Sequence, residues 1–386
     1  MGVRRRTNGD KFPPPLRGRV RVGGSPTSLP IAWKLPSLYV AIVTLVAVTS
    51  AVLSDAPRWP FKPAPLSPQQ TDVMPFDPAP SADATPSPTA TSAPPSGRWM
   101  LQDNAISASL VGVSCADASH CVAVGGAGTI LSTADAGNSW NMGHSGTSHP
   151  LVGVSCPGPA VCYAVTNFGE LLKTGDAGMT WSISSLKNPT PFAIACPTIA
   201  DCVTADGFET HDGGGSWQQA SRLGAVNVAC PASSRCYAVR NQIGHGVILG
   251  KSSGGWTLQA VTPYFLNAVI CTSVNTCVAA GGGESGTNIL TTGDGRNWTV
   301  RQHQATQQTF FDVGCATADV CFVVDGTANV LATTNQGQTW AWQDTGLVGS
   351  LYAVSCPASD SCFAVGGGPA SSGGGLIARY QAEMSR

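Results

Sequence analysis

Several groups on which active sites depend are scarce in this 386-residue chain. Charged residues make up 11% of it, and its six histidines follow no regular spacing. After residue 97, glutamate occurs only at positions 170, 209, 284 and 383. The motifs H-E-x-x-H and G-x-x-x-x-G-K-S/T are absent. These absences argue against a zinc protease and a P-loop NTPase.

Basic charge is scarce over most of the chain. Residues 98–386 contain 11 Lys and Arg against 17 Asp and Glu, whereas residues 1–34 contain eight against Asp10 alone. A mildly acidic body gives no electrostatic reason to bind nucleic acid. We therefore expect no nucleic-acid partner.

Long apolar runs are missing except for one uncharged stretch, residues 35–54. Twenty residues of helix span ~30 Å, the thickness of a bilayer core. Because basic residues precede the run, the positive-inside rule predicts a basic cytoplasmic tail (1–34), a transmembrane signal anchor (35–54) and an exported remainder. A signal peptide cleaved after Ala51 is the alternative. Residues 55–97 contain 12 prolines among Ala, Ser and Thr, a composition typical of an extended linker.

Helical periodicity is missing from residues 98–386, but cysteine has a strict pattern there. All 14 cysteines form C-x5-C pairs, and the first members of successive pairs lie 41, 40, 34, 41, 44 and 41 residues apart. The pairs are Cys115 and Cys121, Cys156 and Cys162, Cys196 and Cys202, Cys230 and Cys236, Cys271 and Cys277, Cys315 and Cys321, and Cys356 and Cys362. A period near forty predicts stacked supersecondary units.

The even count and single spacing favour seven disulfides in an oxidising compartment. Zinc binding and reduced, buried cysteines are the alternatives. Zinc sites usually have shorter C-x2-4-C spacing or include histidines, so we expect no metal and no cofactor.

The sequence of each repeat predicts four short strands. In the first, apolar stretches at 110–114, 122–124 and 129–132 are separated by the cysteine loop and by a Gly-rich turn. A further turn at 135–138 precedes a fourth strand that begins at 139. Four strands per forty residues match a propeller blade. In this arrangement each cysteine pair flanks the loop of the first hairpin.

The third turn carries a motif, which reads Thr133-Ala134-Asp135-Ala136-Gly137-Asn138-Ser139-Trp140 in the first repeat. It resembles the Asp-box of the BNR-repeat and sialidase-superfamily propellers. The wider frame is similar to the photosystem II assembly and stability factor-like propellers, over residues 98–386. The resemblance implies a turn-forming role for Asp135, Gly137, Trp140, Asp176, Gly178, Trp181, Asp212, Gly214, Trp217, Asn335, Gly337 and Trp340. The corresponding stretches Ser253–Trp256 and Asp294–Trp298 are degenerate.

The seventh repeat ends without an Asp-box, while the segment around Trp99 resembles the strand that follows one. We therefore predict an all-β, seven-bladed propeller of four-stranded blades over residues 98–386. Its N-terminal segment would supply the outer strand of the last blade, which removes the open ends.

Strand alternation assigns the loops to two faces, and the loops between strands two and three share one face with the linkers between blades. Irregular loops on a regular scaffold are where binding usually resides. Candidate ligand-binding residues on that face are Arg240, His245, Tyr264, Glu284, His303 and Asp325.

No set of residues suggests catalysis, so we expect no catalytic residue and no enzyme activity. A sialidase-like hydrolase would need an arginine cluster and a Tyr/Glu nucleophile pair, and the F/Y-R-I-P-like motif of that family is absent. The sequence predicts a membrane-anchored binding or assembly scaffold outside the cytoplasm, with a protein or cell-envelope polymer as partner. Glycan binding or a divergent glycoside hydrolase is the alternative.

Overall fold

The computed structural model describes residues 96–102, 106–186, 191–283, 286–304, 308–369 and 374–383. The predicted basic tail, transmembrane segment and nearly all of the proline-rich linker lie outside these residues. Within the described ranges, no helix has the length and apolar character needed to cross a bilayer.

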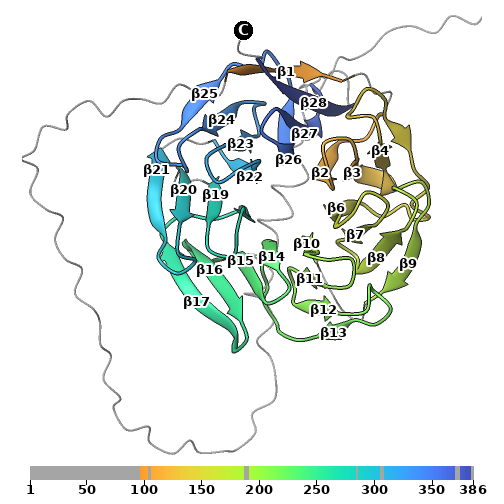
Figure 1. Ribbon diagram of the computed structural model, residues 1–386, viewed down its shortest axis with the longest axis horizontal. Coiled ribbons are helices and arrows are strands. Elements are labelled where there is room, and N and C mark those ends of the chain that lie inside the picture. The colour runs from red at the N-terminus through yellow and green to blue at the C-terminus, as the bar shows by residue number, and fades with distance from the viewer. Residues whose placement is uncertain are drawn as a thin grey trace, which may run out of the picture. The chain divides into compact units, whose positions relative to one another are not determined.

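The described strands form seven four-stranded antiparallel sheets arranged as blades around a central opening (Figure 1). From the inner to the outer strand, blade 1 contains β2 (Leu110–Cys115), β3 (Cys121–Gly125), β4 (Ile130–Thr133) and β5 (Asn141–Met142). Blade 2 contains β6 (Leu151–Ser155), β7 (Cys162–Thr166), β8 (Glu170–Thr174) and β9 (Ser182–Ser185). Blade 3 contains β10 (Ile194–Ala195), β11 (Cys202–Thr204), β12 (Phe208–Thr210) and β13 (Gln218–Gln219).

The remaining blades follow the same order, with longer strands in blade 4. Blade 4 contains β14 (Asn227–Ala232), β15 (Arg235–Gln242), β16 (His245–Ser252) and β17 (Gly255–Thr262). Blade 5 contains β18 (Ala268–Cys271), β19 (Cys277–Gly283), β20 (Gly286–Thr292) and β21 (Thr299–Gln304). Blade 6 contains β22 (Phe310–Cys315), β23 (Cys321–Asp325), β24 (Val330–Thr333) and β25 (Ala341–Gln343). Blade 7 contains β26 (Ser350–Ala358), β27 (Ser361–Gly367) and β28 (Gly375–Ala382), and its outer strand is β1 (Gly97–Leu101).

The ring is closed by this N-terminal strand. β1 pairs antiparallel with β28, so that Trp99 lies opposite Tyr380. The Trp99 indole is buried against Phe322 of blade 6 and Tyr380, with ring centroids 5.7 and 5.4 Å away. Its Nε1 donates a hydrogen bond to Gln343 Oε1 at 3.0 Å. One segment from the start of the propeller therefore links its last two blades, as the sequence predicts.

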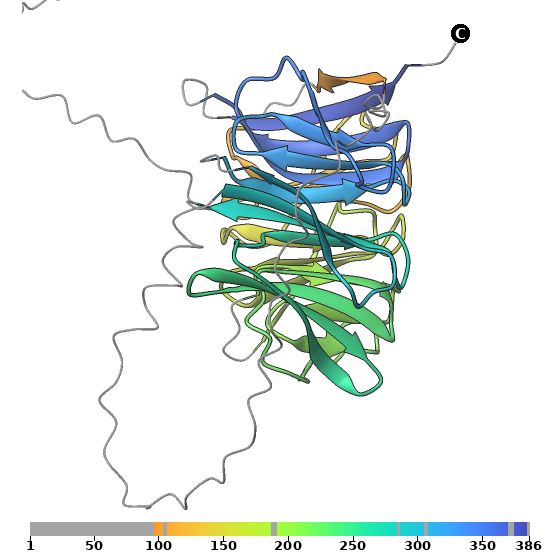
Figure 2. The same cartoon turned by 90° about the vertical axis from the view of Figure 1, so that its left-hand side faces the viewer.

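The core consists of apolar layers between neighbouring blades. On β3, Cys121 and Ala123 pack toward blade 7, whereas Val122 and Val124 pack toward blade 2. A middle strand is therefore buried on both sides, which explains its continuous apolar sequence in place of a polar–apolar alternation. From the side, the ring of blades is a thick disc (Figure 2).

Single polar side chains on the inner strands bind the backbone of the next blade around the ring. Ser114 Oγ accepts a hydrogen bond from the Cys156 backbone N–H at 3.0 Å. The same kind of contact is made by Ser155, Ser355, Asn227 and Asp312. These residues stand one or three positions before the first cysteine of their repeat, a signal that is visible once the repeats are aligned on cysteine.

Candidate functional site

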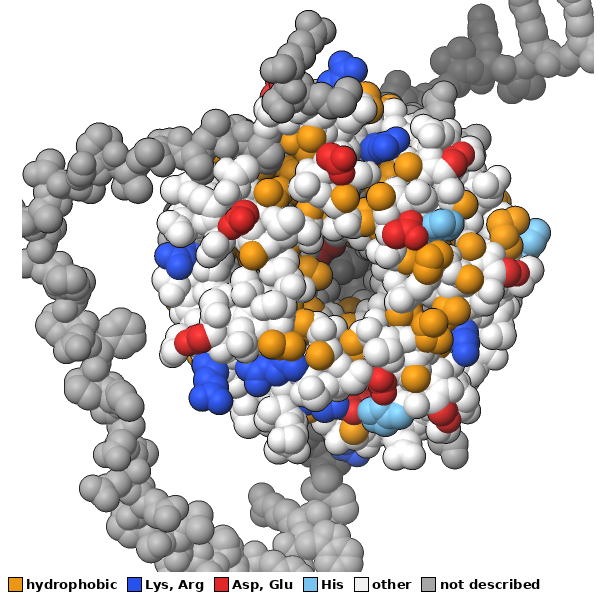
Figure 3. Space-filling model, in the orientation of Figure 1, with side chains coloured by type: hydrophobic (Ala, Val, Ile, Leu, Met, Phe, Trp, Pro, Cys, Tyr) orange, Lys and Arg blue, Asp and Glu red, His pale blue; other side chains and the backbone are white. Residues whose placement is uncertain are grey.

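Two faces of the ring differ in their loops. The disulfide face carries the cysteine loops, such as 116–120, and the Asp-box turns, such as 134–140. The linker face carries the turns between the second and third strands, such as 126–129, and the linkers between blades, such as 143–150. Figure 3 shows one face of the ring, hollowed at its centre, with both signs of charge around the rim and no large field of either.

All seven cysteine pairs form disulfides, and no cysteine is free. Each joins the first and second strands of a blade, with Cα atoms 4.0–4.1 Å apart. In blades 1, 5 and 6 the two cysteines are directly opposite each other in the strand register. The predicted disulfides are therefore present, and the cysteines are not available as metal ligands.

The Asp-box turns are held by their carboxylates. Asp135 accepts hydrogen bonds from the Ser139 backbone N–H at 2.9 Å, the Ser139 hydroxyl at 2.7 Å and the Thr133 hydroxyl at 2.8 Å. The turn residues Ala136 and Gly137 have φ of 59° and 81°, a conformation that favours glycine. Asp176 and Asp212 make the same contacts in blades 2 and 3.

The tryptophan that follows each turn packs between two blades. Trp181 is buried in the layer between blades 1 and 2 and donates a hydrogen bond to Gly178 O at 3.0 Å. Trp140 packs edge-on against Phe363 of blade 7, with ring centroids 5.8 Å apart. Trp217 and Trp340 occupy the corresponding layers of blades 3 and 6. In the Asp-boxes of blades 1, 2, 3 and 6, the glycines have positive φ and the tryptophans pack between blades.

Of the two degenerate boxes, one still forms a carboxylate-bound turn. Asp294 accepts hydrogen bonds from the backbone N–H groups of Arg296 and Asn297 at 2.9 and 2.8 Å. That turn is one residue shorter than a complete box. In blade 4, by contrast, β16 and β17 are joined by the two-residue turn 253–254, which has no carboxylate.

The Asp-boxes should make the fold sensitive to strong acid. Hydrogen bonds from the side chain and backbone of Thr180, and then from Thr174, lower the pKa of Asp176 to about 2. A lowered pKa in the folded state stabilises the protein above pH 3.8, and this stabilisation is lost as the pH falls toward 2. We expect Asp176→Asn to keep the turn at pH 7 while the melting temperature falls less steeply between pH 4 and pH 2.

We expect Asp176→Asn to keep the turn because Asn335 occupies the position of Asp176 in the Asp-box of blade 6. Its Oδ1 accepts from the Thr339 N–H at 2.9 Å and its Nδ2 donates to the Thr339 hydroxyl at 2.9 Å. Asp176→Ala should lower the melting temperature at pH 7 because it removes these bonds. The exposed Asp360 is a suitable control position for Asp→Asn. If the melting temperature of Asp176→Asn fell as steeply between pH 4 and pH 2 as that of the unaltered protein, the lowered pKa of Asp176 would be contradicted.

The candidate ligand residues of the linker face are spread over blades 4, 5 and 6. Arg240 lies on β15 opposite Val247, and its Nε is buried without a hydrogen-bond partner among the described residues. His245 begins β16 and contacts Gln242 Oε1 and Ile243 O at 2.9 and 3.0 Å. Tyr264 lies partly buried in the linker beside Gly246.

The remaining three candidates are His303, Glu284 and Asp325. His303 lies on β21 opposite Asn288, and Glu284 lies outside the described residues. Asp325 is buried, and its carboxylate accepts hydrogen bonds from the backbone N–H groups of Thr327 and Asn329 at 2.8 and 2.9 Å. Asp325 therefore holds the turn between β23 and β24. Arg240 and His245 share one hairpin with Tyr264 beside it, whereas Asp325 lies in blade 6.

The linker face also carries a cluster in blade 2. His149 Nδ1 lies 3.0 Å from Glu170 Oε1, at an angle that does not make a directed hydrogen bond. The Thr147 hydroxyl donates to Glu170 Oε2 at 2.7 Å. The His149 ring stacks on Phe168 with centroids 4.6 Å apart, and 63% of Phe168 is exposed. The repeat pattern gives no signal for Glu170, which only the fold brings to His149.

Asp312 on the inner strand β22 is the one carboxylate whose pKa is strongly raised among those described. Part of the residue reaches the surface, but its carboxyl group is enclosed by protein. Burial raises its pKa to about 7, against the opposing effect of hydrogen bonds from the Val354 and Val313 N–H groups.

The raised pKa predicts a pH dependence opposite to that of the Asp-boxes. The protonated form is favoured in the folded state, so the contribution of Asp312 is complete below pH 3.8 and is lost as the pH rises toward 7. We expect the unaltered protein to melt at a higher temperature than Asp312→Ala. This difference in melting temperature should be largest at pH 4 and smaller at pH 8. A difference that widens with rising pH would contradict this assignment. Thermal scans of both proteins across this range measure it.

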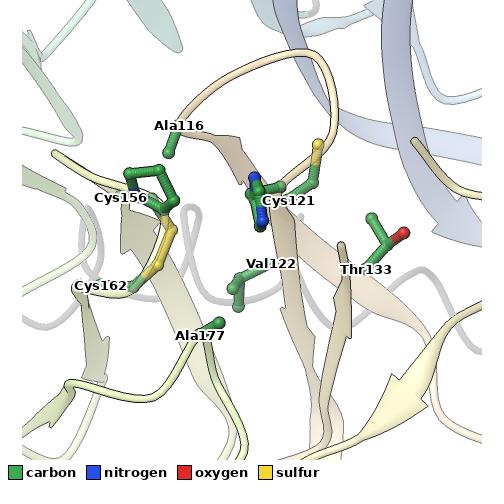
Figure 4. Close-up of a pocket in the computed structure, with 9 residues that line it drawn as sticks. Ala116, Cys121, Val122, Thr133, Cys156, Cys162 and Ala177 are labelled. Atoms are coloured by element: carbon green, nitrogen blue, oxygen red, sulfur yellow. A yellow bond between two sulfur atoms is a disulfide. The ribbon is translucent and has the colours of Figure 1, made fainter. Parts of the chain in front are cut away.

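The described residues contain no group of three or more His, Cys, Asp and Glu side chains placed to hold a metal ion. A shallow recess lies on the disulfide face between blades 1 and 2 (Figure 4). Its empty space of about 160 Å³ includes open solvent, and it encloses no cavity that would hold a water molecule.

Comparisons with known proteins identify the fold. No family model matches the chain, and no curated protein matches it. The solved structure "YCF48 bound to D1 peptide" is 21% identical with a TM-score of 0.61, and the match covers 75% of this chain and 100% of that one. YCF48 from Cyanidioschyzon merolae is 16% identical with a TM-score of 0.59, over 74% and 98% of the two chains. The WD40 β-propeller domain of Doa1 is 9% identical with a TM-score of 0.55, over 75% and 98%. At these identities the likeness establishes a propeller fold.

Proposed function

We propose that this chain is a membrane-anchored β-propeller outside the cytoplasm, and that it acts as a non-catalytic binding or assembly scaffold for a protein or cell-envelope partner. The observation that carries the proposal is a set of exposed apolar side chains on the linker face. Ile243, Val348 and Phe168 are 95%, 70% and 63% exposed. All three lie in loops, and loops on a rigid scaffold are where binding residues usually reside.

Ile243 is the sharpest of these features. It stands at the tip of the hairpin between β15 and β16, and the His245 ring contacts both the Ile243 carbonyl and Gln242. The tip is therefore held in place before any partner arrives, which reduces the entropy lost on binding. An apolar anchor on a preorganised hairpin is suited to a pocket on a protein partner.

Two further observations support the proposal. Seven disulfides favour an oxidising compartment, which agrees with export by residues 35–54. One solved propeller of similar fold, YCF48, is described with a bound D1 peptide. A ring of this architecture is thus able to hold a peptide in that protein.

Affinity capture from an envelope extract tests the proposal. Residues 96–386 serve as bait, beside a variant with Phe168→Ser, Ile243→Ser and Val348→Ser. The matched control is Ile199→Ser, because Ile199 is 51% exposed on the disulfide face. We expect one partner that the bait and the control retain and the triple variant loses. If the bait, the triple variant and the control all retained the partner, the binding surface would not include Phe168, Ile243 and Val348.

The glycan alternative has its own test. A panel of fluorogenic glycosides should show no turnover by the scaffold. Turnover that Glu284→Gln abolishes would replace the binding proposal with a hydrolase.

A further inference from the structure

An aspartate–histidine pair lies in the cysteine loop of blade 1. His120 Nδ1 is 2.9 and 3.0 Å from the two carboxylate oxygens of Asp117. Asp117 Oδ1 also accepts the backbone N–H groups of Ser119 and His120 at 2.8 and 2.9 Å. Burial acts to raise the pKa of Asp117, but these hydrogen bonds outweigh it and lower the pKa. The carboxylate therefore stays ionised and fixes the imidazole with its proton on Nδ1.

The histidine lines the recess between blades 1 and 2, and a disulfide forms part of the same lining. Figure 4 shows the Cys156–Cys162 bridge on one wall, close to Ala116 and Ala177. His120 Nε2 has no hydrogen-bond partner within the described part of the chain. Since Nδ1 is occupied by Asp117, Nε2 is the ring nitrogen available for proton transfer beside the disulfide.

Comparison of the repeats shows that this arrangement belongs to one blade. His120 directly precedes the second cysteine of its loop, and the residues at that position in the other blades are Val161, Asp201, Arg235, Thr276, Val320 and Ser361. Val161 packs against the apolar layer that contains the disulfide of blade 3, and Val320 against the layer that contains the disulfide of blade 7. The position thus faces the disulfide of the following blade, and among the seven loops only blade 1 places a histidine there.

We propose that the Cys156–Cys162 disulfide exchanges with a small external thiol, with His120 as the acid–base group and Asp117 as its positioning residue. This chemistry does not depend on the proposed binding function. The other six bridges then serve as structural bridges, while this one responds to the thiols around the protein.

The exchange balances without any other reactant. His120 Nε2 takes the proton of the incoming thiol, and the resulting thiolate attacks Cys156 Sγ, since Cys156 is 9% exposed and Cys162 only 1%. The bond between the incoming sulfur and Cys156 forms as the Cys156–Cys162 bond breaks. The Cys162 thiolate leaves and takes the proton back from His120. The products are one mixed disulfide and one protein thiol, and the reverse reaction restores the bridge.

The test measures exchange at each disulfide separately. The full-length chain is exposed to reduced glutathione for set times, quenched with acid, alkylated and analysed by peptide mass spectrometry. We expect glutathione to appear first on Cys156, and His120→Gln to slow that reaction at least about tenfold while the other six bridges keep their rates. Unchanged rates at those six also show that the variant is folded.

The Cys196–Cys202 bridge is the matched internal control, because Cys196 is also 9% exposed but faces no histidine. Equal exchange rates at Cys156 and Cys196 in the unaltered chain would overturn the proposal. So would a His120→Gln variant that exchanges at the original rate.

The pair can also be transplanted into blade 2. Gly158→Asp with Val161→His reproduces the spacing of Asp117 and His120, and a Cβ at Gly158 would lie 3.7 Å from its nearest neighbour, Ile199. We expect faster exchange at Cys196–Cys202 in this variant, and an unchanged rate there would count against the proposal. For Asp117→Asn, ¹⁵N spectra of His120 should show loss of the Nδ1–H tautomer together with slower exchange. An unchanged tautomer would remove Asp117 from the proposed chemistry.

Discussion

Reduction of all seven disulfides is expected to lower the melting temperature of the propeller by at least about 15 °C. Each bridge closes a short loop, with a sequence separation of six residues. The chain-entropy model gives about 2 kcal/mol for a loop of this length. Seven such contributions are comparable with the ~5–15 kcal/mol that stabilises a typical domain, and each kcal/mol corresponds to roughly 2–4 °C.

Thermal scans with and without a phosphine reductant measure this effect. The matched comparison is Cys115→Ala with Cys121→Ala, which removes one bridge and should cost about 2 kcal/mol. Iodoacetamide labelling of the unfolded, unreduced chain should find no free thiol. A reduced propeller that melts within a few degrees of the oxidised one would show that packing between blades, and not the bridges, maintains the ring.

Replacement of Trp99 with alanine is expected to cost about 3–5 kcal/mol, or roughly 6–20 °C in melting temperature. The indole is 5% exposed, contacts two aromatic rings and donates a hydrogen bond to Gln343. Its removal leaves a cavity at the point where the chain closes on itself. Because β1 is the outer strand of blade 7, the loss should loosen blades 6 and 7 before the others.

Trp342→Ala is the matched control, since Trp342 is 40% exposed on the outer strand β25. It should lower the melting temperature clearly less. Hydrogen exchange followed by mass spectrometry should show reduced protection in β27 and β28 for Trp99→Ala. Equal effects of the two substitutions would mean that β1 docks without contributing to closure.

Much of this fold could be predicted because repetition multiplies a weak local signal. A single C-x5-C pair is compatible with zinc, but seven at one spacing indicate a blade and its first hairpin. The segment around Trp99 could be assigned to the last blade because the seventh repeat lacks the strand that this segment resembles.

Other features could not be read from the pattern. Glu170 on β8 meets His149, which lies in the linker before β6. Asp325 looked like a ligand residue from its loop, yet its carboxylate is engaged by the backbone of its own turn. Alternation assigns a side chain to a face of the ring but does not reveal which groups it meets there.

By itself the sequence determined the number of blades, their strand order, the disulfide pairing and the closing segment. These are local properties, repeated every forty residues, so that register and turn chemistry specify them. Only the tertiary structure decided that His120 of one blade faces the disulfide of the next, and that Ile243 projects from the opposite face. The physical reason is that these contacts depend on how neighbouring sheets twist and pack, and a residue that occurs in one repeat alone carries no periodic signal of that geometry.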